Sequence, residues 1–227
     1  MDHLGYRMKF GALGPSTNTV VQPDFDDMRP VGVTNHYSRI IIPDAPVQSD
    51  ADFLQLVHNI QDNTLQAVDV LKSCEMQYLV MGMSAATFWD GRDGAQKYLA
   101  MMRERAGVEV SCGSFATEAA LNVYKAKRIA FLSPYFPVAN AQVSRFYQDC
   151  GFTVVRELCL RRPSPVQIAH TTDAMCRDAL KQLDGDDVDV FLPLKSGAQH
   201  HAANAAEPVD RDARHGCGLV ARMIAAA

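Results

Sequence analysis

Short polar side chains gather at five points of the sequence, each directly after a run of apolar residues. The clusters are Gly-Pro-Ser-Thr-Asn (14–18), Gly-Met-Ser-Ala-Ala-Thr (82–87), Ser-Cys-Gly-Ser (111–114), Ser-Pro-Tyr (133–135) and Lys-Ser-Gly (195–197). Hydroxyl and amide groups can bind an anion, and the first four clusters precede an expected helix start, where free backbone N–H groups favour negative charge. The same residue types also cap helices without any ligand. A single cluster therefore favours capping, whereas several clusters at one sheet edge favour a shared oxyanion site.

The ligand expected at such a site is a carboxylate rather than a nucleotide. No G-x-G-x-x-G motif follows an expected strand, and no G-x-x-x-x-G-K-[ST] motif occurs. No pair of histidines has metal-ligand spacing, so no metal is expected.

Strand-like and helix-like segments alternate along the chain and would position these clusters. We expect strands at 8–13, 36–42, 77–84, 108–111, 128–134, 152–160 and 188–194, and helices at 51–74, 94–107, 116–127, 140–151 and 172–184. This alternation predicts right-handed crossovers and parallel sheets flanked by helices, an α/β fold. Ligands of such folds bind beyond the carboxyl ends of the strands, which is where the polar clusters fall.

Length and composition narrow the class of protein. The chain has 227 residues, a net charge of −4 and 48% hydrophobic residues, so it can form one large domain or two small ones with a filled core. The acidic balance argues against nucleic acid as a partner, and no segment is apolar enough to span a membrane. We expect a cytoplasmic protein, since no signal peptide is visible and the six cysteines are scattered without a CxxC pair. A homo-oligomer is possible.

Three segments carry a resemblance to a known family. In this order, FGALGPSTNTVVQPDF (10–25), MGMSAATFWDG (81–91) and RIAFLSPYFPVANAQVSRFYQDCGFTVV (128–155) resemble the aspartate/glutamate racemase superfamily. The closest branch is that of maleate cis–trans isomerase and arylmalonate decarboxylase. The similarity runs from about residue 7 to about residue 195, and SPYFPVANAQV is its most specific part.

The resemblance implies two similar α/β lobes related by a pseudo-twofold axis, with a cofactor-free site in the cleft between them. The first lobe would comprise residues 1–110, completed by 208–227, and the second lobe residues 111–207. In this family, hydroxyls and backbone amides grip a substrate carboxylate while charge develops on it as an enediolate. Cysteine thiols act on the adjacent carbon.

Individual residues match the family pattern unevenly. Asn18 matches the carboxylate-binding Asn, Tyr135 the Tyr of the "PY" motif, and Ser84 a hydroxyl residue of the decarboxylase. Where the family has its two cysteines, this chain has Gly-Met-Ser (82–84) and Lys-Ser-Gly (195–197). The candidate catalytic residues are Tyr135, Ser84 and Cys112. The candidate substrate-binding residues are Ser16, Thr17, Asn18, Gly82, Met83, Ser114, Ser164, Ser196 and Gly197.

Several assignments have two readings. Cys112 lies at an expected strand end and could replace a family cysteine, but a free cysteine is often a small buried apolar residue. Phe88 and Trp89 could shape a pocket for an aryl or alkyl group, or they could pack in the core. The tail, 198–227, is either divergent from the family or an out-of-frame end.

Two functions are therefore in view. The first is a cofactor-independent isomerase or decarboxylase, which would act on a small dicarboxylic acid of the maleate or arylmalonate kind through an enediolate-type intermediate. The alternative is a catalytically impaired relative that binds a small carboxylate. The missing cysteines favour the alternative, or a decarboxylase-like reaction with another proton donor, while Asn18, Ser84 and Tyr135 fit both functions.

Overall fold

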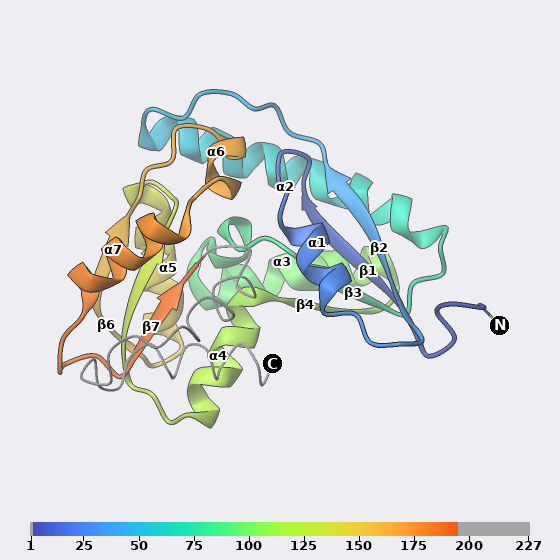
Figure 1. Ribbon diagram of the computed structural model, residues 1–227. Coiled ribbons are helices and arrows are strands. Elements are labelled where there is room, and N and C mark those ends of the chain that lie inside the picture. The colour runs from blue at the N-terminus through green and yellow to red at the C-terminus, as the bar shows by residue number, and fades with distance from the viewer. Residues whose placement is uncertain (1, 195–227) are drawn as a thin grey trace.

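Two sheets of parallel strands form the frame of the molecule (Figure 1). The computed structural model describes residues 2–194. The first sheet has the order β2-β1-β3-β4 and the second has the order β6-β5-β7. The first sheet consists of β1 (Met8–Pro15), β2 (Val33–Ile40), β3 (Tyr78–Met81) and β4 (Glu109–Cys112). The second consists of β5 (Arg128–Ser133), β6 (Thr153–Cys159) and β7 (Val190–Pro193).

Helices connect successive strands, as parallel pairing requires. They are α1 (Val21–Asp27), α2 (Asp50–Lys72), the 3₁₀ helix η1 (Ala85–Phe88), α3 (Gly91–Ala106), α4 (Gly113–Val123), α5 (Pro137–Asp149), α6 (Pro165–Ala169) and α7 (Asp173–Leu183). The α/β prediction, with parallel sheets flanked by helices, is confirmed. Every listed strand and helix is present, with ends shifted by a few residues. Helix α1 was indicated only by the helix start expected after the cluster at 14–18, and α6 and η1 were not predicted.

The two sheets share one strand order. In each sheet the first strand in sequence, β1 or β5, lies between the second and the third. The carboxyl ends of these central strands carry the clusters at 14–18 and 133–135. The lobe boundary expected at 110/111 falls inside β4, which pairs with β3 of the first sheet. The proposed completion by residues 208–227 lies outside the described residues.

Helix α2 extends across both sheets (Figure 1) and contacts β1 and β2 of the first and α5 beside the second. Its start is fixed by Ser49, whose side chain accepts a hydrogen bond from the Asp52 N–H. Its buried side chains recur every three or four residues: Phe53, Leu56, Val57, Ile60, Thr64, Ala67, Val68 and Leu71. The helix thereby joins the two halves of the molecule through one apolar face.

The core is continuous between the halves. The cluster that fills the first half also includes Tyr135, Phe136 and Ala139 from the second. Strand β5 is buried on both faces, as expected of a central parallel strand. Phe131 packs toward α5, and Leu132 packs toward α7. Among residues 2–194, no helix has the length and apolar character needed to cross a membrane.

Candidate active site

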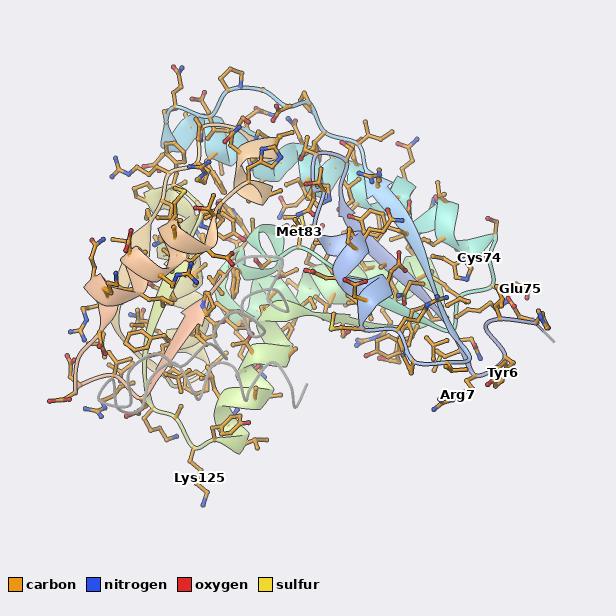
Figure 2. All side chains as sticks on the ribbon, in the orientation of Figure 1. Tyr6, Arg7, Cys74, Glu75, Met83 and Lys125 are labelled. Atoms are coloured by element: carbon orange, nitrogen blue, oxygen red, sulfur yellow. The ribbon has the colours of Figure 1, made fainter. Side chains whose placement is uncertain are left out.

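A cavity lies where the carboxyl ends of β1, β3 and β5 meet, beneath α2. Its polar lining comes from Thr17, Asn18, Ser84 and Tyr135. Its apolar lining comes from Pro15, Ile42, Phe53, Leu56, Val57, Ile60, Met83, Ala85, Pro134, Pro165, Ile168 and Leu194. Figure 2 shows Met83 near the middle of the molecule, between the two groups of strands. Of the four polar clusters within residues 2–194, three thus come together at this cavity.

Ser84 and Tyr135 join the two sheets within the cavity. Their hydroxyl oxygens lie 2.6 Å apart, and either oxygen can be the donor. Each hydroxyl has one hydrogen, so one hydrogen bridges the pair and the other remains for a ligand. Burial raises the pKa of Tyr135 to about 12, with the hydrogen bond to Ser84 opposing this rise. The phenol therefore stays neutral, and able to donate, at ordinary pH.

A chain of buried hydrogen bonds holds Tyr135 in place. The Tyr135 N–H donates to Ser133 Oγ at 3.1 Å, and the Ser133 hydroxyl in turn donates to Asn140 Oδ1. The ring of Phe53 packs against Tyr135, with the ring centroids 5.4 Å apart. Among the described residues, Asn140 Nδ2 is buried and has no hydrogen-bond partner, which lowers the stability of the fold. Ser133 and Asn140 were not among the predicted site residues, although both lie in the SPYFPVAN segment that carried the resemblance.

The cluster at 14–18 combines capping with cavity lining. Asn18 Oδ1 accepts hydrogen bonds from the N–H groups of Val20 and Val21, both at 2.9 Å. These two helix-start amides are therefore engaged by the protein itself. Asn18 is only 8% exposed and also lines the cavity. Asn18 therefore holds the start of α1 and also forms part of the cavity wall.

Two further contacts stabilise this loop. The hydroxyl of Ser16 donates to the Ile42 carbonyl and accepts from the Ile42 N–H, both at 3.1 Å. Arg39 donates to the Ser16 carbonyl at 3.0 Å. Ser16 therefore has a structural role, because it links the end of β1 to the segment after β2. Its neighbour Thr17 lines the cavity.

Gly82 occupies a position that no side chain could share. A Cβ at this residue would lie 2.5 Å from Val21 Cγ1 and 2.8 Å from the Leu13 carbonyl oxygen. The Gly82 N–H donates to that same carbonyl at 2.7 Å. The chain of β3 therefore passes close against β1 directly before Met83 and Ser84, which sets both residues at the cavity.

The cluster at 111–114 lies elsewhere. Cys112 is 2% exposed, and its sulfur lies 3.0 Å from the Ser114 hydroxyl oxygen, which is also buried. Neither residue is among the described lining of the site cavity. Gly113 instead lines a second, mainly apolar cavity of about 590 Å³ between α1, α4 and β7. The position of Cys112 supports its packing interpretation.

The remaining candidate residues either lie outside the described cavity lining or fall outside the described residues. Ser164 caps α6 by accepting a hydrogen bond from the Gln167 N–H, and its neighbour Pro165, not Ser164, lines the cavity. Phe88 is buried against Phe146 and Tyr147, and neither it nor Trp89 belongs to the described lining. Ser196 and Gly197 lie outside the described residues. Within the described part of the chain, no group of three or more His, Cys, Asp or Glu side chains could hold a metal ion.

Solved structures with the same fold are known. A maleate isomerase from Pseudomonas putida S16, a cysteine variant with maleate, superposes with a TM-score of 0.76 at 14% identity, covering 95% of this chain and 89% of that one. A Nocardia farcinica maleate cis-trans isomerase with a covalently bound succinylcysteine intermediate has a TM-score of 0.74 at 15% identity, covering 96% and 91%. Arylmalonate decarboxylase has a TM-score of 0.59 at 15% identity, covering 82% and 75%.

These structural neighbours are of the two kinds that the sequence resemblance indicates. No family model matches the sequence, and no curated protein sequence matches it. The likeness at this identity establishes the fold.

Proposed function

We propose that the protein is a cofactor-independent isomerase or decarboxylase that acts on a small carboxylic acid through an enediolate-type intermediate. The observation that carries the proposal is the hydroxyl pair of Ser84 and Tyr135, which lies 2.6 Å apart inside a cavity also lined by Asn18. The fold neighbours, maleate isomerases and arylmalonate decarboxylases, support this general kind of enzyme.

The chemistry depends on donors that are already in place. When a proton or carbon dioxide leaves the carbon next to a carboxylate, the electron pair moves onto the carboxylate oxygens. A fixed hydroxyl donor stabilises that growing charge, because it needs no reorganisation as the reaction proceeds. Tyr135 is held by Ser133 and Phe53 and stays protonated, with its pKa raised to about 12. Tyr135 can therefore act as the fixed donor that stabilises the growing charge.

A second function is favoured by the position of the thiols. Cys112 is buried and lies away from the cavity, and the described cavity lining contains no cysteine. If the reaction needs a thiol beside the substrate carbon, a protein with these donors would bind a small carboxylate without turning it over. This relative with impaired catalysis remains the alternative.

One experiment separates the two functions. The full chain is incubated in deuterated buffer with maleate, phenylmalonate, aspartate and glutamate, and products and deuterium uptake are measured by NMR. Turnover that is lost in Tyr135→Phe supports the enzyme. A rise in melting temperature without turnover supports the binding protein. If none of the four acids is turned over or raises the melting temperature at high concentration, both functions are contradicted for these acids.

A further inference from the structure

The described lining of the site cavity contains no charged side chain. Its polar residues, Thr17, Asn18, Ser84 and Tyr135, are all neutral. Helix α1, which follows the loop at 14–18, carries three aspartates and no basic residue, so it adds negative charge beside the loop. Buried charges in proteins are generally paired. A carboxylate bound here is therefore expected to have a cation nearby.

Arg39 brings a cation to the loop that lines this cavity. It lies near the end of β2, opposite Gly14 of β1 in the sheet register. Its Nη1 donates to the Ser16 carbonyl at 3.0 Å and to the Asn18 carbonyl at 3.4 Å. Thr17 and Asn18 line the cavity, so the guanidinium is bonded to a loop that forms part of the cavity wall.

The charge of Arg39 is held in place and is not neutralised by a carboxylate of the described chain. The guanidinium carbon lies over the Tyr37 ring, 5.5 Å from its centroid. Arg39 makes no ion pair with an Asp or Glu of residues 2–194. Other arginines of this part of the chain do make such pairs: Arg92, Arg103, Arg105, Arg128, Arg145 and Arg156. The positive charge of Arg39 is therefore available to an anion.

The hydrogen bonds of Arg39 also act on the loop itself. A peptide carbonyl bonded to a cation is polarised, which makes the N–H of the same peptide group a stronger donor. The Ser16 carbonyl belongs to the peptide group that carries the Thr17 N–H, and Thr17 lines the cavity. Arg39 therefore favours an anion both through its own charge and through this peptide group.

We infer that Arg39 supplies the positive charge that favours an anion in this cavity. The inference rests on the proposed function, because it assigns the charge to the same site. Arg39 is not part of the described lining, so it acts on the ligand from outside the cavity. Its side chain is exposed, and added salt should therefore weaken its effect by screening.

Binding of acids to the full-length chain at low and high salt tests this inference. Maleate and phenylmalonate are titrated by isothermal calorimetry at low and at high NaCl concentration. At low salt, Arg39→Met is expected to weaken the binding of an acid by about three- to tenfold. The variant should also lose less affinity than the wild type when salt is added. Arg39→Lys keeps the charge and should retain most of the affinity and of its salt dependence. If Arg39→Met does not fold, Arg39→Gln removes the charge and keeps a donor for the loop.

Arg7→Met is the matched control. Arg7 is exposed and donates to the Val31 carbonyl at 3.2 Å, so its substitution removes the same charge and a similar hydrogen bond. It precedes β1, whose eight residues separate it from the loop at 14–18 by about 25 Å. Arg7→Met is therefore expected to bind the acid with the affinity and the salt dependence of the wild type.

Three results overturn the inference and leave the proposed function standing, since the wild type binds the acid in each. The first is wild-type affinity in Arg39→Met. The second is equal weakening in Arg39→Met and Arg39→Lys, which would make Arg39 a structural contact of the loop only. The third concerns Lys195, which lies outside the described residues: loss of the salt-dependent affinity in Lys195→Met alone would assign the charge to that residue. If the wild type binds neither acid, the inference and the proposed function fail together for these acids.

Discussion

The hydroxyl oxygens of Ser84 and Tyr135 lie 2.6 Å apart, although the residues are 51 positions apart in the sequence. Ser84 follows β3 of the first sheet, and Tyr135 follows β5 of the second. A hydroxyl hydrogen bond weakens when its oxygens separate beyond about 3 Å. The donor arrangement of the site therefore depends on how the two sheets are placed relative to each other, and five predictions test this arrangement and its surroundings.

Tyr135→Phe removes one donor and keeps the ring that packs on Phe53. If the enzyme hypothesis is correct, turnover should fall by roughly 10²–10³-fold, because one preorganised oxyanion donor is lost. The melting temperature should change little. Tyr98→Phe is the matched control, since it deletes another buried hydroxyl, bonded to Thr64, away from the cavity. Equal rates for both variants and wild type would remove Tyr135 from the mechanism.

Two substitutions at Asn18 separate its two contacts. Asn18→Ala should cost roughly 0.5–2 kcal/mol of stability, because the N–H groups of Val20 and Val21 lose their acceptor. It should also weaken acid binding. Asn18→Asp keeps an acceptor for both amides, so stability should be retained, but its negative charge repels a bound carboxylate. Chemical denaturation and acid titration on each variant measure the two effects. Unchanged affinity in Asn18→Asp would mean that Asn18 is only a cap.

Ser133→Ala should destabilise the protein by about 1–3 kcal/mol for each buried group left unpaired. The Tyr135 N–H loses its acceptor, and Asn140 Oδ1 loses its donor. Ser144→Ala is the control, since Ser144 bonds Glu157 at the surface and should change stability by less than about 0.5 kcal/mol. Urea denaturation measures both. A Ser133→Ala variant as stable as the control would show that this hydrogen-bond chain contributes nothing.

Tyr135 also predicts a loss of stability in strong alkali. Its pKa is raised from 10 to about 12 by burial, so between these pH values the unfolded chain loses the proton while the folded chain keeps it. The unfolded state then binds fewer protons, and the free energy of unfolding falls as the pH rises through this window. Because Tyr37 and Tyr98 have pKa values raised likewise to about 12, they share the effect. Tyr135→Phe should therefore flatten the slope of stability against pH between 10 and 12 without abolishing it. If the slope in Tyr135→Phe equals that of the wild type, the prediction that the buried Tyr135 phenol stays neutral in this pH window is contradicted.

Thiol alkylation should leave most of the ligand-binding or catalytic activity intact. Cys112 and Cys176 are buried, and burial raises the pKa of Cys150 to about 12 and that of Cys159 to about 11. Since the thiolate is the reactive form, Cys150 and Cys159 should react slowly, and burial should protect Cys112 and Cys176. Peptide mass spectrometry after timed iodoacetamide treatment identifies the modified thiols. Inactivation that follows the modification of Cys112 would assign it to the catalytic machinery.

Most of the fold could be predicted because its strands are short apolar runs separated by amphipathic helices. Apolar residues recur at helical spacing over 51–74, and the structure has the corresponding helix, α2, at Asp50–Lys72. The strand order could not be predicted from such patterns. Cys112 is the last residue of β4 and Ser114 follows it. Strand β4 lies at the edge of the first sheet, and this edge position keeps both residues from the cavity.

The site could be predicted only in part. The polar residues Thr17, Asn18, Ser84 and Tyr135 were visible as clusters at strand ends. The apolar lining of the cavity could not be predicted, because Phe53 and Leu56 have the same spacing as residues that simply pack in a core. Helical periodicity identifies the buried face of a helix and does not reveal which part of that face adjoins an open space.

The close passage of β3 against β1 restricts how this site can change during evolution. A cysteine at Gly82 would place its Cβ 2.8 Å from the Leu13 carbonyl oxygen, and that oxygen also accepts the Gly82 N–H. A smaller residue at position 21 would relieve the clash with the Val21 side chain. The clash with the Leu13 carbonyl would remain, since no substitution removes a backbone oxygen. A lineage or a directed-evolution experiment that adds a nucleophilic thiol here is therefore expected to do so at Met83 or Ser84, whose side chains already reach the cavity.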